Sequence, residues 1–143
     1  MEYSRIIETL GGEKTLGHPI RSRMDFVELG ERGLTKSSLS HLAKSLSLSM
    51  KELARLLPVT ERTLRRYGAQ QHLSAVVSEQ ALQIAQVAAT GSALFEDQEK
   101  FLAWLSIPSA PLGGEKPFDL LRSRFGIELV LDELGRIAHG LPA

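Results

Sequence analysis

The sequence predicts an all-α protein, and three observations support that prediction. Apolar residues recur at spacings of three and four along almost every patterned segment, which is the period of an amphipathic helix. No segment of useful length alternates apolar and polar residues as a half-buried strand does. Helix-start signals precede several of these segments, and the clearest is the S-x-x-E spacing of Ser49 and Glu52.

The first elements are short. Tyr3 to Leu10 predicts a short helix that the pair Gly11-Gly12 ends, and His18 to Arg23 predicts a loop. Met24 to Glu31 is too short a pattern to separate helix from strand, and we favour a helix there.

A clearer helix is predicted from Thr35 to Leu46, with Thr35 as its N-cap. Its inward face consists of Leu39, Leu42, Ala43 and Leu46. Its serines are expected on the outer, solvated face: Ser37, Ser38, Ser40 and Ser45.

Ser49 to Tyr67 predicts two short helices joined by a tight turn. A capping box of Ser49 and Glu52 starts the first helix at Met50, and its inward residues are Met50, Leu53, Ala54 and Leu57. Pro58 cannot continue this helix, because it lacks an N–H and clashes with the preceding turn. Thr60 caps the second helix, which turns Leu64 and Tyr67 inward and leaves Glu61, Arg62, Arg65 and Arg66 outward.

Two such helices are typical of a helix-turn-helix, which inserts its second helix into the DNA major groove. Arginine in that position forms two hydrogen bonds to guanine or binds a backbone phosphate. We therefore predict DNA contacts first at the three arginines and second at the residues that open the helix: Arg62, Arg65, Arg66, Thr60 and Glu61. The alternative is a solvated basic helix in an ordinary bundle, and Pro58 stands where such turns usually have glycine.

The second half begins with a predicted hinge at Ala69 to Leu73. A long helix is expected from Val76 to Ala93, interrupted near its end by Gly91. Its alanine-rich stripe is either core or a dimer seam, and we favour core: Val77, Ala81, Ile84, Ala85 and Ala88.

Three further elements complete the chain. A helix is predicted from Asp97 to Ser106, followed by a Pro- and Gly-rich loop from Ile107 to Lys116. Pro117 suits the first position of a new helix, where its missing N–H costs nothing. The last helix is expected from Ile127 to Ala138, and Gly135 within it marks either close approach of another backbone or a tolerated weakness.

The net charge of zero conceals a division between the two halves. Residues 1–70 hold 12 Lys and Arg against 8 Asp and Glu, a net of +4, whereas residues 71–143 hold 5 against 9, a net of −4. A basic front half suits a polyanion, and an acidic back half repels one. We therefore predict a DNA-binding region at residues 1–70 and a dimerisation and partner-binding region at residues 71–143. Because +4 is modest for DNA binding, dimerisation is expected to double the phosphate contacts.

Patterns typical of enzymes are missing from the sequence. The four histidines do not form an H-x-x-x-H pair, and no nucleophile elbow, P-loop or dinucleotide fingerprint occurs. The carboxylate pairs Glu96-Asp97 and Asp132-Glu133 fit a helix N-terminus and a helix surface. We expect no enzyme activity, cofactor or metal. Without cysteine, an export signal or a long apolar run, a cytoplasmic protein with no membrane span is expected.

The final third carries a more particular pattern. It runs through Trp104-Leu105, Pro108, Pro111-Leu112-Gly113-Gly114, Pro117-Phe118-Asp119-Leu120-Leu121, Gly126, Leu134-Gly135-Arg136-Ile137 and His139-Gly140. In this pattern the segment resembles the toxin-binding domain of the Xre/MbcA/ParS antitoxins, and LARLL-VTERTLRR is similar to the family's front half. The chain departs from the family at Ser109, where asparagine is common, and at Pro58, where glycine is common.

The resemblance implies a type II antitoxin that forms a homodimer and binds a RES-domain toxin. Such toxins are similar in fold to ADP-ribosyltransferases and consume NAD or modify targets with it. The resemblance also implies that the C-terminal segment blocks the toxin's active site while the front half represses the operon. The expected toxin contacts are Leu112, Gly113, Gly114, Arg136, His139, Gly140, Leu141, Pro142 and Ala143.

Two rival functions stay open at this point. The first is a ligand-responsive repressor whose back half holds an effector pocket and the dimer seam. The second is a structural adaptor with no DNA role. Trp104 is as compatible with core packing as with a partner contact.

Overall fold

The computed structural model describes residues 3–140, which form helices connected by turns and no β-sheet. The all-α prediction is therefore confirmed. In chain order the elements are α1 (Tyr3–Thr9), α2 (Glu13–Leu16), α3 (Arg23–Arg32), α4 (Lys36–Ser45), α5 (Met50–Ala54), α6 (Glu61–Arg65), α7 (Ala75–Phe95), α8 (Gln98–Leu105), the 3-10 helix η1 (Ala110–Leu112), α9 (Pro117–Leu120) and α10 (Arg124–Ala138).

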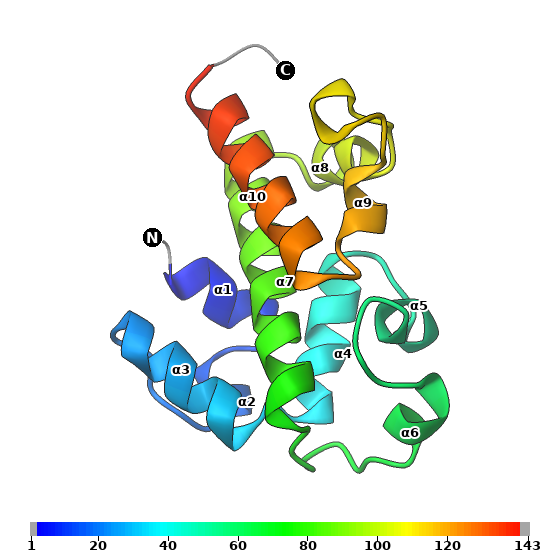
Figure 1. Cartoon of the computed structure of the whole chain (residues 1–143). Helices are drawn as coiled ribbons and strands as arrows, with labels where there is room; N and C mark the ends of the chain where they lie inside the picture. The colour runs from blue at the N-terminus through cyan, green and yellow to red at the C-terminus, as the bar shows by residue number, and fades with distance from the viewer. Residues whose placement is uncertain (1–2, 141–143) are drawn as a thin grey trace.

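The long helix α7 is the axis on which the molecule is built. It runs through the middle of the fold and contacts α1, α3, α4, α8 and α10 (Figure 1). The predicted alanine-rich stripe of α7 is fully buried within the single chain, so its assignment to the core is confirmed. Other residues of α7 are buried too, among them Gln80 and Val87, because neighbours cover it on several sides.

Gly91 does not interrupt α7, contrary to expectation. The helix continues to Phe95, and the Phe101 side chain of α8 packs against the glycine. A Cβ at position 91 would lie 2.0 Å from the Phe101 ring. Glycine is therefore required by the close approach of an aromatic ring that is itself completely buried.

The segment predicted as a hinge, Ala69 to Leu73, is instead anchored to the start of α4. The amide N–H of Leu73 donates to the carbonyl of Leu34 at 2.8 Å, and that of Ser37 donates to Ala69 at 2.9 Å. A Cβ at Gly33 would lie 2.1 Å from the Leu73 carbonyl oxygen. Backbone bonds between residues far apart in sequence carry no local signal, which is why the composition of this segment suggested a hinge.

Two smaller differences separate the sequence interpretation from the structure in the first half. A single turn, α2, follows Gly12 and is too short to show a periodicity. Ser38 was expected on the outer face of its helix but is completely buried, where its amide N–H donates to the Thr35 hydroxyl at 3.3 Å. Its side chain is small enough for the interior, and the predicted cap at Thr35 is confirmed.

The final third follows the predicted order. α9 begins at Pro117 as expected. α10 begins at Arg124, three residues before the predicted start at Ile127, because the Ser123 hydroxyl accepts the N–H of Gly126. Gly126 lets α10 pass close to the end of α9, since a Cβ there would lie 2.0 Å from the Leu120 carbonyl oxygen.

Candidate functional site

The two helices of the predicted helix-turn-helix begin where the sequence predicted, but α5 ends at Ala54, before Leu57, and α6 ends at Arg65, before Tyr67. The N–H of Ser49 donates to the Glu52 carboxylate at 2.9 Å, and the N–H of Glu52 donates to the Ser49 hydroxyl at 3.1 Å. These reciprocal bonds hold the pKa of Glu52 below its ordinary value, chiefly through the Ser49 N–H. α5 begins at Met50 and α6 at Glu61, with Thr60 as the N-cap of α6.

The turn between α5 and α6 accommodates proline without strain. Within the described residues, no position between Arg55 and Thr60 has a positive φ, so the turn does not require glycine. Leu56 and Leu57 anchor it in the core, and Pro58 lies exposed beyond them. Pro58 therefore fits the geometry of this connection.

The outward face of α6 is basic and accessible. Arg62, Arg65 and Arg66 are exposed, and none of them forms an ion pair within residues 3–140. Leu64 holds the opposite face in the core at 1% exposure. The Thr60 hydroxyl accepts from Thr63 N–H at 3.1 Å and lies 2.9 Å from the Thr63 hydroxyl, so it serves mainly to cap the helix.

Lys36 positions α6 from a distance and had no signal in the sequence. Its Nζ donates to the carbonyls of Tyr67 at 3.1 Å and Arg65 at 3.4 Å. A cation at the C-terminal end of a helix meets the negative end of the helix dipole and satisfies its free carbonyls. Lys36 opens α4, so it links that helix to the basic face.

The predicted partner-binding loop is closed by backbone bonds around η1. Ser109 N–H donates to the Glu115 carbonyl at 3.0 Å, and Gly114 N–H donates back to Ser109 at 2.9 Å. Gly113 and Gly114 have φ of 71° and 81°, a region that favours glycine. Both are exposed, while Leu112 is half-buried against the core. The Ser109 side chain forms no cap bond, so main-chain bonds, rather than this side chain, close the loop.

The end of α10 brings charged residues near the chain terminus. Arg136 donates to Glu133 at 2.9 Å. Glu133 is only 3% exposed, which corrects the expectation that the Asp132-Glu133 pair lies on the helix surface. The His139 Nδ1 donates to the Gly135 carbonyl at 2.7 Å, and Gly140 ends the helix with φ of 70°. The predicted contacts Leu141, Pro142 and Ala143 lie outside the described residues.

The two predicted sites lie at opposite ends of the molecule. Figure 1 shows α6 at one end of α7, and the loop between α8 and α9 together with the last turns of α10 at the other. η1 packs against α10, so the structure brings the loop and the last helix together. Trp104 on α8 is half-buried, its ring 5.8 Å from that of Phe95, so it contributes to packing.

A groove opens along one side of α7, and it was not predicted. Two neighbouring hollows of about 380 and 460 Å³ share Ile6 and Gln86 as lining residues. α3 and α10 contribute further walls, and large apolar side chains on these three helices stay exposed: Met24, Val27, Val76, Phe125 and Leu129. Of these five side chains, Met24 and Val27 line one of the hollows directly.

Family comparisons match two consecutive regions of the chain. Residues 25–86 match the antitoxin Xre-like helix-turn-helix domain, and residues 90–140 match the antitoxin Xre/MbcA/ParS C-terminal toxin-binding domain. The chain belongs to the Xre/MbcA/ParS antitoxins. Membership of this antitoxin family implies DNA binding through the helix-turn-helix domain, and the two matched regions meet within α7.

Among solved structures, this antitoxin is similar to a chain in the crystal structure of the M. tuberculosis MbcT-MbcA toxin-antitoxin complex. The TM-score is 0.60 and the identity is 22%, over 76% of this chain and 96% of that chain. At this identity the likeness concerns the fold. No curated protein matches the chain. Within residues 3–140, no helix is long and apolar enough to cross a membrane.

Proposed function

We propose that this antitoxin neutralises a RES-type, ADP-ribosyltransferase-like toxin by covering its active site and represses its own operon through α6. The observation that carries the proposal is the separation of the two surfaces along α7. A toxin bound at the η1 and α10 end leaves the basic face of α6 free for DNA. The role requires binding alone and no catalysis.

The toxin-binding part of the proposal rests on charge and accessibility. The loop glycines Gly113 and Gly114 are exposed, and Arg136 and His139 flank the end of α10. The net charge of −4 in residues 71–143 complements a cationic pocket of the kind that a dinucleotide diphosphate requires. The remaining predicted toxin contacts, Leu141, Pro142 and Ala143, follow this end of α10 in the sequence.

Growth rescue tests this part of the proposal. Co-expression with a RES-type toxin encoded beside the antitoxin should restore growth, and deletion of residues 141–143 should weaken the rescue. This short deletion is preferable to a cut at residue 136, because loss of Arg136 would leave the buried Glu133 without that partner. Absence of both rescue and co-purification with the intact antitoxin would refute the toxin proposal.

Operator retention tests the DNA part. Arg62→Ala, Arg65→Ala and Arg66→Ala should each weaken binding to DNA from the antitoxin's own promoter, and phosphate-contacting arginines should lower the salt slope by about 1. Lys44→Ala, at an exposed position on α4, is a control. Unchanged affinity and salt slope in all three arginine variants would show that α6 does not read DNA.

The proposal includes a homodimer, because residues 1–70 carry a net charge of only +4 and a single copy of this region binds DNA weakly. The exposed apolar residues of α3, α7 and α10 supply surface for self-association, Phe125 being 72% exposed. Phe125→Asp should lower the dimer fraction in sedimentation without loss of helicity. A monomeric wild-type antitoxin at all concentrations would contradict this.

The groove keeps a ligand-responsive repressor as the second candidate. Its hollows fall within the volume range of small-molecule sites, and Arg23, Glu79 and Arg124 line one of them. This candidate predicts that a small molecule, and no toxin, controls operator binding. Growth rescue by co-expression separates the two, since a plain repressor would not neutralise a toxin.

A further inference from the structure

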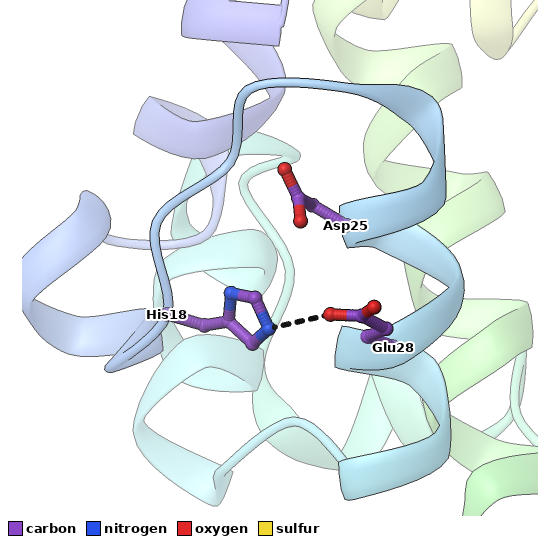
Figure 2. A group of neighbouring side chains, drawn as sticks. All are labelled: His18, Asp25 and Glu28. Carbon is purple, nitrogen blue, oxygen red and sulfur yellow. Dashed lines mark ion pairs between the residues drawn. The ribbon is translucent and has the colours of Figure 1, made fainter.

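Three potential metal ligands converge beside the connection between α2 and α3, away from both surfaces described above (Figure 2). His18 lies in that connection, while Asp25 and Glu28 lie on α3. Their ligand atoms are all within 4.8 Å of one another. A sequence search for histidine pairs at helical spacing could not find this cluster, because it holds one histidine from a loop and two carboxylates from a helix.

The imidazole of His18 is oriented by the backbone carbonyl of the next residue. Its Nδ1 lies 2.8 Å from the Pro19 carbonyl oxygen, which accepts only, so Nδ1 carries a proton. Nε2 then faces Glu28 at 3.3 Å from a carboxylate oxygen (Figure 2). A lone pair on Nε2 opposite a carboxylate requires a positive charge between them, either a proton or a metal ion. A histidine whose second ring nitrogen donates to a carbonyl is the usual arrangement around a bound metal.

Asp25 is fixed in a similar way. Its Oδ2 accepts the N–H of Arg21 at 2.7 Å and that of Ser22 at 3.0 Å. The Arg21 bond is the main cause that lowers the pKa of Asp25 and keeps it anionic at neutral pH. Oδ1 has no hydrogen bond within residues 3–140. Asp25 therefore offers a free anionic oxygen on a carboxylate that the backbone already orients.

We propose that His18 Nε2, Asp25 Oδ1 and a carboxylate oxygen of Glu28 form a site for a divalent cation of the Zn²⁺ class. One imidazole with two carboxylates suits Zn²⁺, whereas Mg²⁺ and Ca²⁺ prefer oxygen ligands alone. The two carboxylates balance the double positive charge. With three protein ligands, water completes the coordination. The site is independent of the proposed toxin and DNA roles.

Only a small movement separates this cluster from a coordination shell. Tetrahedral Zn²⁺ with bonds of about 2.1 Å places its ligand atoms roughly 3.4 Å apart. The His18 side chain is 13% exposed and held in place, whereas the Glu28 side chain is 55% exposed and free to adjust. Bound metal ties the connection after α2 to α3, so it stabilises the N-terminal helices against unfolding.

Calorimetric titration of Zn²⁺ into chelator-treated full-length antitoxin at pH 7 tests the site. One Zn²⁺ per chain should bind with micromolar or better affinity and raise Tm. His18→Gln and Glu28→Gln should each lower the affinity by about tenfold or more. The nitrogen resonances of the His18 ring should shift on Zn²⁺ addition, with Nε2 affected most. Mg²⁺ should compete only weakly.

Matched controls come from the same region. Glu31→Gln alters an exposed carboxylate on α3 outside the cluster, and His41→Gln alters an exposed histidine on α4. Both should bind Zn²⁺ like the wild type. The proposal would be overturned if His18→Gln and Glu28→Gln bound Zn²⁺ as tightly as the wild type, or if the wild type bound no Zn²⁺ at about 100 micromolar. A proton would then be the charge between His18 Nε2 and the Glu28 carboxylate. Both cluster variants should match wild-type Tm in chelator, since an ion pair whose Glu28 side chain is 55% exposed contributes little.

Discussion

Two glycines in long helices show how differently one residue type serves this fold. Gly91 in α7 lies against the Phe101 ring, whereas a Cβ at Gly135 in α10 would meet nothing within 4 Å. The sequence predicts a helix break at the first and leaves close approach of another backbone open at the second. Within the described residues, nothing approaches Gly135 closely, so that interpretation is wrong there. Close approach occurs instead at Gly91, where an aromatic ring packs against the glycine. Sequence alone does not say which side chain a glycine faces.

A pair of alanine substitutions tests this contrast. Gly91→Ala should lower the free energy of unfolding by about 2 kcal/mol, because the new methyl group overlaps a buried ring. Gly135→Ala should raise it by about 1 kcal/mol through helix propensity. Urea unfolding of both variants measures the two effects, and equal changes of the same sign would contradict the assigned contacts.

The capping box of α5 predicts a pH dependence. The pKa of Glu52 is lowered in the folded state from the ordinary value of 4.5, so its stabilisation is fully present above that pH and is lost as pH falls through the lower folded pKa. Glu52→Gln keeps an oxygen acceptor but does not titrate. Its Tm should therefore fall less steeply than the wild type's below about pH 4.5. Glu31→Gln, which alters a carboxylate without a hydrogen bond in the described residues, is the control.

At the scale of elements, local signals located the helices and distant contacts set their neighbours. Ser49, Thr60 and Pro117 mark helix starts as predicted, because capping depends on residues three positions apart. The Pro58 turn formed despite its lack of glycine. The contact that holds α6 at its C-terminal end comes from Lys36, about thirty residues earlier, and no local pattern reveals it.

Removal of that contact should loosen α6. Lys36→Met keeps the aliphatic stem but loses both bonds, to the Arg65 carbonyl in α6 and to the Tyr67 carbonyl just after it, so the unfolding free energy should fall by about 1 kcal/mol. Amide hydrogen exchange should rise most in α6. Lys44→Met, at an exposed position of α4, provides the control. Exchange that rises equally across the chain would argue against a local role.

At the scale of the whole molecule, buried Gln80 joins the two halves. Its side-chain amide donates to the Leu56 carbonyl at 2.6 Å, in the turn before α6, and to the Arg122 carbonyl at 3.0 Å, before α10. The charge division at residue 70 does not divide the core, because one hydrophobic cluster spans both halves. In the interior, helix α7 and the Gln80 side-chain amide connect the two regions that match the family domains.

Gln80→Met should therefore destabilise the whole chain. It fills similar volume but leaves two carbonyls without their donor, at a cost of about 2 kcal/mol. Gln86→Met, half-buried on the same helix and lining the groove, should change stability far less. The wild type should unfold in a single thermal transition. If that transition splits in two in Gln80→Met, this amide couples the two halves. If Gln80→Met unfolds like the wild type, this role is contradicted.

The sequence by itself determined the helical class, most helix boundaries and the family, because period, caps and short motifs act over a few residues. It also indicated which residues face outward on α6. Only the tertiary structure decided that the segment before α7 is anchored, that Glu133 is buried, and that His18 meets Asp25 and Glu28. These features depend on which helices become neighbours, and that choice arises from packing around α7 rather than from any local pattern.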